Sequence, residues 1–167
     1  MIRLLLLAAL LGSAFGQSTP ATSAPESFQF LQGHAYMGGE SLVWENGKLI
    51  STKNFANFDG KGGVRKTVEK FEPAPQAWAR FWKTLEAAGV WKWKDHYENS
   101  VYIADGEGWS LELRHAGRSL KSQGYNAAPP EFDAFRKAVD ELIKESKKLP
   151  SSVTTPDDLT LLASRCL

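Results

Sequence analysis

A single amphipathic segment constrains the fold more than any other part of the chain. Pro75 suits the first position of a helix, where a missing N–H costs nothing, and Gly89 suits the left-handed residue that ends one. Between them one apolar stripe recurs at intervals of three and four residues: Trp78, Phe81, Trp82, Leu85 and Ala88. Each large aromatic side chain can bury about 150–250 Å². The segment therefore predicts a helix that packs on a sheet of several strands.

A second helix follows Pro129 and Pro130. Acidic residues lie in its first turn and lysines near its end, in agreement with the helix dipole. Its apolar stripe comprises Phe132, Phe135, Val139, Leu142 and Ile143. When Pro129 is aligned with Pro75 the two stripes match, and a hairpin with a glycine turn precedes each helix. This match raises the hypothesis of a degenerate strand-strand-helix duplication.

Two glycine turns predict hairpins. The first is Asn46-Gly47, whose two-residue turn sets Glu45 opposite Lys48, with the pairs Trp44–Leu49 and Val43–Ile50 beyond it. The second is Ala116-Gly117, which follows a strand in which Trp109, Leu111 and Leu113 face one way. Further strands are expected within 28–37, 64–71 and 101–104, and 54–63 is expected to be a loop.

These patterns together predict an α+β fold. We expect an antiparallel sheet of about five to seven strands with both long helices packed on one face, because two helices with one stripe each need a common surface. The core should join the helix stripes to Trp109, Leu111 and Leu113.

The first sixteen residues are typical of a secretory signal peptide. Arg3 supplies the positive start, Leu4–Leu11 form an apolar run too short to span a bilayer, and the small residues before Gln17 suit cleavage there. Residues 17–27 are predicted to be a flexible lead-in, 28–149 a single domain, and 150–167 a linker with a short C-terminal helix. We therefore expect a secreted or periplasmic protein that does not span the membrane after signal removal.

Charge and cysteine content exclude some partners. The chain has 20 basic and 19 acidic residues, and loss of Arg3 with the signal peptide leaves equal numbers. This balance argues against nucleic acid, which requires a basic excess on some face. Cys166 is the only cysteine, so no internal disulfide can form. It is either a free thiol or a partner for another chain.

The region from about Trp78 to Ile143 contains a pattern of residues that is also known from other proteins. The pattern comprises Trp91 and Trp93, Tyr97, Asp105-Gly106 with Trp109, Ser122, Gly124, Asn126, Pro129-Pro130 and Phe132. In this pattern the chain resembles a group of small exported bacterial proteins of unknown function. The resemblance implies a shared α+β fold and implies no particular activity.

No motif places a metal, a cofactor or a nucleophile. The histidines at 34, 96 and 115 form no zinc-binding pair, the loop glycines lack a P-loop lysine, and no G-x-S-x-G elbow occurs. Asp105 and Glu107 form a carboxylate pair, but both stay solvated on an exposed turn, which favours a role in the turn over catalysis. We therefore expect no metal, no cofactor and no catalytic residues. The alternative is a small exported hydrolase that uses Asp105, Glu107 and His96.

The residues after Gly89 alternate between tryptophan and lysine, which predicts an extended segment with Trp91 and Trp93 on one side. Either both indoles close the core, or one stays partly exposed. In the second case a binding strip for sugars, peptides or glycan acids would comprise Trp91, Trp93, Lys92, Lys94 and Tyr97. The favoured functional hypothesis is an exported non-catalytic domain that binds a macromolecule or envelope component, either a protein or a glycan.

Overall fold

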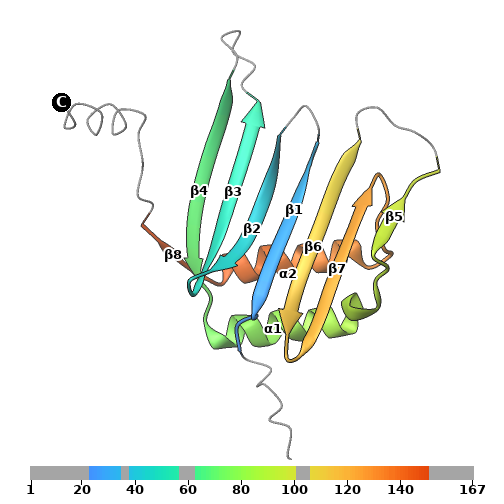
Figure 1. Ribbon diagram of the computed structural model, residues 1–167. Helices are drawn as coiled ribbons and strands as arrows, with labels where there is room; N and C mark the ends of the chain where they lie inside the picture. Colours follow the sequence, from blue (N-terminus) through green and yellow to red (C-terminus); the bar gives the residue numbers. More distant parts are fainter. Residues whose placement is uncertain (1–22, 35–37, 57–62, 101–105, 151–167) are drawn as a thin grey trace, which may run out of the picture.

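The computed structural model describes residues 23–34, 38–56, 63–100 and 106–150. This part of the chain contains eight strands, two α-helices and one short 3₁₀ helix, η1 (Figure 1). Their order is β1 (Ser27–His34), β2 (Gly38–Glu45), β3 (Lys48–Ala56), β4 (Val64–Glu72), α1 (Pro75–Ala87), η1 (Val90–Lys92), β5 (His96–Glu98), β6 (Glu107–His115), β7 (Arg118–Tyr125), α2 (Phe132–Lys144) and β8 (Lys147–Leu149).

All eight strands form one sheet in the order β5-β7-β6-β1-β2-β3-β4-β8. Every neighbouring pair is antiparallel except β5 and β7, which are parallel. The α+β class is confirmed, but the predicted count of five to seven strands is too low and the sheet is mixed. The two additional short strands, β5 and β8, have three residues each and were not predicted from the sequence. Lys147 and Lys148 suit the last turn of a helix equally well, yet α2 ends at Lys144 and these lysines pair with β4.

The predicted hairpin register is confirmed. Glu45 pairs with Lys48, Trp44 with Leu49 and Val43 with Ile50. Asn46 and Gly47 both have positive φ angles, 50° and 74°, as a two-residue type I′ turn requires. The hairpins β2–β3 and β6–β7 lie on either side of β1. The duplication itself stays a hypothesis.

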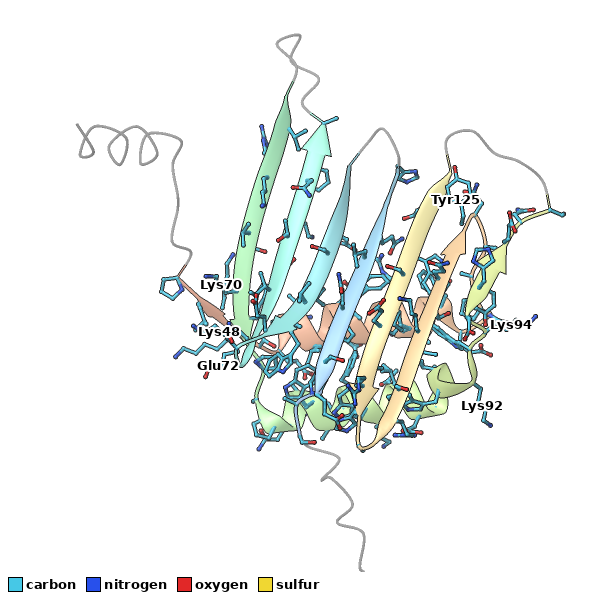
Figure 2. All side chains as sticks on the ribbon, viewed as in Figure 1. Lys48, Lys70, Glu72, Lys92, Lys94 and Tyr125 are labelled. Atoms are coloured by element: carbon cyan, nitrogen blue, oxygen red, sulfur yellow. The ribbon has the colours of Figure 1, made fainter. Side chains whose placement is uncertain are left out.

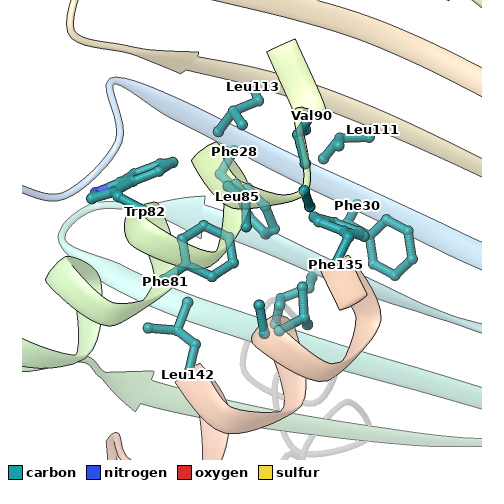
Figure 3. Close-up of a cluster of buried hydrophobic side chains, with 14 of the residues drawn as sticks. Phe28, Phe30, Phe81, Trp82, Leu85, Val90, Leu111, Leu113, Phe135 and Leu142 are labelled. Atoms are coloured by element: carbon teal, nitrogen blue, oxygen red, sulfur yellow. The ribbon is translucent and has the colours of Figure 1, made fainter. Parts of the chain in front are cut away.

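Both long helices pack on one face of the sheet, here called the inner face (Figure 1). Buried side chains from α1 and α2 meet those of the central strands in one core (Figure 3). The predicted meeting of the helix stripes with Trp109, Leu111 and Leu113 is confirmed. The fully buried members include Phe28, Phe30, Leu49, Phe81, Leu85, Val90, Leu111, Leu113, Phe135 and Leu142. Neither α1 nor α2 covers the opposite, outer face (Figure 1).

The end of α1 redirects the chain. Gly89 has a φ angle of 62°, and its N–H donates to the carbonyl of Glu86 at 3.1 Å, as in a Schellman ending. The predicted extended segment from Trp91 is wrong, because η1 occupies Val90–Lys92. A tight helical turn places Trp91 and Trp93 in different surroundings, so the two-residue alternation does not put both indoles on one side.

Part of the predicted lead-in lies against the domain. The indole N–H of Trp82 donates to the carbonyl of Ser23 at 2.8 Å, and the N–H of Glu26 donates to the carbonyl of Arg114 at 2.9 Å. Pairing of β1 begins at Ser27. The predicted signal peptide and the predicted C-terminal helix lie outside the described residues, as does the strand expected at 101–104.

Candidate functional site

The inner face of the sheet is divided into two regions. The covered region lies under the helices, near the hairpin turns, and is apolar. The open region lies beyond α2, toward the opposite ends of the strands (Figure 1). Along β1 the inward-facing residues change from Phe28 and Phe30 to Gln32 and His34. The open region comprises Gln32 and His34 on β1, Gly38 and Glu40 on β2, Lys53 and Phe55 on β3, and Glu107 on β6.

A cleft of about 420 Å³ lies between this open region and α2. We call it the inner cleft. It is lined by Gln32, Gly33, His34, Gly38, Gly39, Glu40, Lys53, Phe55, Ala56, Glu107 and Arg136. Arg136 is the only contribution of α2 to this lining. The sheet therefore supplies the floor, and the helix supplies one charged wall.

Arg136 organises one side of the inner cleft. Its Nη2 lies 2.9 Å from the carboxylate of Glu40, and its guanidinium lies over the Phe30 ring at 5.5 Å from the centroid. The ammonium of Lys53 lies 3.8 Å from the other oxygen of the same carboxylate. Two cations thus share one carboxylate, which leaves this side of the cleft with a net positive charge.

The other side of the inner cleft carries a negative charge. The side-chain amide N–H of Gln32 donates to the carboxylate of Glu107 on β6. Since β1 and β2 separate β6 from β3, Glu107 and Lys53 lie on opposite sides of the cleft. The inner cleft is therefore dipolar, with positive charge toward β3 and negative charge toward β6.

Two polar atoms of this cleft are buried without a hydrogen-bond partner in the described part of the chain. They are Nη1 of Arg136, a donor, and Oε1 of Gln32, an acceptor. An unsatisfied buried polar group costs about 1–3 kcal/mol, and more when it is charged. Phe55 adds an apolar surface at the rim, since the residue is 51% exposed. The residues that line the cleft thus include one unpartnered donor, one unpartnered acceptor and one exposed aromatic ring.

The residues of the predicted binding strip around Trp91 do not form one surface, because Trp91 and Trp93 lie in different surroundings. Trp93 is 7% exposed and packs in the core against Trp109 and Phe135. Trp91 is half-buried: the guanidinium of Arg118 lies 4.3 Å from its ring, and its N–H donates to Glu86 at 2.9 Å. The structure therefore does not bring the two indoles together on one surface.

The remaining residues of that strip lie at the same corner of the molecule. Lys92 and Lys94 are exposed at its edge (Figure 2). The hydroxyl of Tyr97 accepts a hydrogen bond from the backbone N–H of Lys94 at 3.0 Å, and its ring lies 5.9 Å from that of Trp109. Tyr97 thus supports the edge of the core, while the lysines face solvent.

Two residues of the hydrolase hypothesis, Glu107 and His96, lie on opposite faces of the sheet. Glu107 faces inward on β6, next to Gln32. His96 lies on the outer face of β5, where its Nδ1 is 3.5 Å from the side-chain amide of Gln123. Asp105 lies outside the described residues.

Four residues of the inner cleft were not predicted as site residues from the sequence: Gln32, Glu40, Lys53 and Arg136. A signal for Arg136 exists, because it follows Phe132 by four positions and therefore lies on the apolar stripe of α2. A charged residue on a core-facing stripe needs a partner. A signal for Gln32 exists as well. Side chains alternate between the two faces of a strand, so Gln32 is expected to face inward like Phe28 and Phe30.

Comparison of the chain with family models, with curated proteins and with solved structures finds no match. The resemblance to small exported bacterial proteins thus stays an expectation from the sequence. Within residues 23–34, 38–56, 63–100 and 106–150, no group of three or more His, Cys, Asp or Glu side chains is placed to hold a metal ion. Neither helix in those ranges has the length and apolar character needed to cross a membrane.

Proposed function

We propose that this protein is an exported, non-catalytic binding domain whose inner cleft takes a zwitterionic group. The ligand is a free amino acid or the corresponding group of a peptide that belongs to a larger envelope component. Its carboxylate binds on the side of Arg136 and Lys53, its ammonium binds on the side of Glu107, and an apolar side chain lies on Phe55.

The observation that carries this proposal is the pair of buried, unpartnered atoms in one cleft. A ligand carboxylate would accept from Nη1 of Arg136, and a ligand ammonium would donate to Oε1 of Gln32. A ligand of one charge would satisfy only one of them. The separated charges of Glu107 and Lys53 favour the same orientation.

The test is an NMR titration of the ¹⁵N-labelled mature protein with leucine, N-acetyl-leucine and leucinamide, followed by the other amino acids and a set of dipeptides. Free leucine should shift the backbone amides of Glu40 and Glu107. Each blocked form should bind about tenfold more weakly or worse, because a hydrogen bond to a charged group contributes about 1.5–3 kcal/mol.

Two matched pairs of variants locate the site. Arg136→Met should abolish the shifts, whereas Lys137→Met, exposed on the same helix, should leave them unchanged. Likewise Glu107→Gln should weaken binding and Glu112→Gln, on the outer face of the same strand, should not. Equal binding of free and blocked leucine would disprove a zwitterion site. The proposal also fails when no amino acid or dipeptide shifts an amide of the inner cleft.

A further inference from the structure

The outer face carries a second depression, about 470 Å³ in volume, which the function proposed above does not use. Its floor is a row of glycines. Gly33 on β1 is paired with Gly39 on β2 and with Gly108 on β6, so three adjacent strands lack a side chain at the same level. Tyr125 on β7 is paired with Gly108 and continues the row. We call this depression the outer trough.

The fold requires two glycines of the row but not the third. A Cβ on Gly33 would lie 2.8 Å from backbone atoms of β2, and a Cβ on Gly39 would lie 2.6 Å from the carbonyl oxygen of Gln32. Close packing of β1 against β2 thus explains both. A Cβ on Gly108 would meet its nearest atom, in the Tyr125 ring, at 3.7 Å, which is an ordinary contact. The fold does not need glycine at 108, yet this glycine keeps the trough open. Glycine within a strand often marks a place where a ligand approaches the backbone.

Tyr125 supplies a fixed aromatic surface at one end of the outer trough (Figure 2). Its ring lies against Gly108, and its hydroxyl accepts a hydrogen bond from the N–H of Gly106 at 3.2 Å. The ring is held at two points, while 37% of the residue stays exposed. Leu31, 38% exposed, contributes an apolar contact from the neighbouring row. A ligand therefore meets an aromatic ring whose position is already set, which lowers the entropy cost of binding.

The lining of the outer trough is uncharged. None of the described residues that line it is an aspartate, glutamate, lysine or arginine. Its outward-facing polar side chains are the hydroxyl of Ser110, the amide of Gln123 and the imidazole of His96. A charged ligand would lose its hydration here without gaining an opposite charge. The lining instead suits a ligand that combines hydroxyl groups with a flat apolar surface.

From these observations we propose that the outer trough binds an uncharged sugar of a glycan chain, with one pyranose ring stacked on Tyr125. The C–H surface of the ring covers Tyr125 and the floor at Gly108, and its hydroxyl groups hydrogen-bond with Ser110 and Gln123. This site lies on the opposite face of the sheet from the inner cleft and does not rest on the function proposed for that cleft.

The test titrates the ¹⁵N-labelled mature protein with two neutral oligosaccharides, cellohexaose and chitohexaose, and with an acidic one, oligogalacturonate, at millimolar concentration. At least one neutral oligosaccharide should shift the amides of Gly33, Gly39 and Gly108. Tyr125→Ala should weaken its binding about tenfold, the upper range for loss of one aromatic contact, and Tyr125→Phe should retain most of it. Gly108→Leu should abolish binding because the new side chain fills the trough.

Three controls make the result decisive. Ser119→Leu adds the same side chain at an exposed position of β7 outside the trough and should leave binding unchanged. Thermal unfolding should show that Gly108→Leu is folded, with Gly108→Ala as the milder variant if it is not. Arg136→Met, which alters only the inner cleft, should bind the glycan normally.

The proposal is overturned by tighter binding of oligogalacturonate, by equal effects of Ser119→Leu and Gly108→Leu, or by absence of shifts with both neutral oligosaccharides. Shifts of the same glycine amides on raising the protein concentration alone would also overturn it, since they would identify a second copy of the chain as the occupant.

Discussion

The residues Trp109 and Gln32 are paired across β6 and β1 and face the same side of the sheet, yet they belong to different surroundings. Trp109 is 7% exposed, lies 4.6 Å from the ring of Phe132, and donates its indole N–H to the carbonyl of Ala127. Gln32 lies in the inner cleft with one buried oxygen that has no partner in the described part of the chain. The boundary between the covered and the open region therefore runs between two neighbouring residues.

This difference shows that the sheet does more than support the helices. In the covered region most inward-facing side chains are apolar and none of the buried ones is a carboxylate, lysine or arginine, although Nε1 of Trp93 and Nδ1 of His115 also lack a hydrogen-bond partner in the described part of the chain. In the open region the same strands carry charged and amide side chains that burial alone would disfavour. Groups that cost stability without serving the core are typical of binding sites. The comparison thus predicts that changes in the two regions affect different properties.

The largest effect is expected for Trp109→Ala. Truncation of a buried aromatic side chain removes its transfer free energy and leaves a cavity, so the variant should lose about 3–5 kcal/mol of unfolding free energy. Urea unfolding followed by tryptophan fluorescence or circular dichroism measures this loss. A loss below about 1 kcal/mol would place Trp109 outside the core. The boundary between the covered and the open region would then not lie between Trp109 and Gln32.

The covered region also contains a buried titratable side chain, that of His115, which gives the next largest effect. Its ring stacks on Trp82 at 3.8 Å between centroids, and the residue is 3% exposed. Burial, assisted by the charge of Arg118, lowers the pKa of His115 below 6.5, although the carboxylates of Glu26 and Glu86 oppose this shift.

The direction of the pH dependence follows from that lowered pKa. As the pH falls through about 6.5, the unfolded chain takes up a proton at this histidine before the folded protein does, so stability is lost. One proton gives a slope of at most about 1.4 kcal/mol per pH unit. Urea unfolding between pH 8 and 5 should therefore show a decline that is absent or smaller in His115→Phe, which retains a stacked ring. An identical decline in both proteins would show that His115 does not carry it.

The covered region was largely predictable from the sequence because its signals are local. Asn46-Gly47 permits one two-residue turn, which fixes the β2–β3 register, and the helix stripes identify the buried faces. The short elements were not predictable in the same way. Lys147 and Lys148 suit a helix end as well as a strand, and the alternation around Trp91 also occurs where a 3₁₀ turn precedes an extended residue.

The open region was not predictable, since it depends on how far the helices extend across the sheet. Glu40, Lys53 and Glu107 come from three different strands, and no spacing in the sequence relates them. The same holds for the outer trough, whose row of glycines follows from the pairing of β2, β1 and β6. Local periodicity thus identifies cores, whereas sites that join several strands require the register of all of them.

A smaller effect on stability is expected when the open region is made apolar. The double variant Gln32→Met, Arg136→Met removes both unpartnered buried atoms and keeps long side chains in place. The variant also takes one partner from each of Glu107 and Glu40. Its unfolding free energy should still lie within about 1 kcal/mol of the wild type, because two unsatisfied buried groups are removed, Glu40 keeps Lys53 as a partner and Glu107 is only half-buried. Urea unfolding under the conditions used for Trp109→Ala tests this. A loss comparable to that of Trp109→Ala would mean that the polar groups belong to the core and would abolish the distinction between the regions.

The smallest effect on stability is expected for Phe55→Ser, and it separates a ligand contact from a packing contact. Phe55 is 51% exposed at the rim of the inner cleft, and surface substitutions without a specific structural role change stability by about 0.5 kcal/mol or less. Binding should respond differently. Leucine, whose side chain would lie on the ring, should bind more weakly to the variant, whereas glycine, with no side chain, should bind both proteins equally. NMR titrations of the two amino acids measure this ratio, and Val64→Ser, at a residue 69% exposed on β4, provides the control. If leucine and glycine both bind the variant more weakly by the same factor, Phe55 shapes the charged part of the cleft. If leucine binds the variant as it binds the wild type, Phe55 does not contact the ligand.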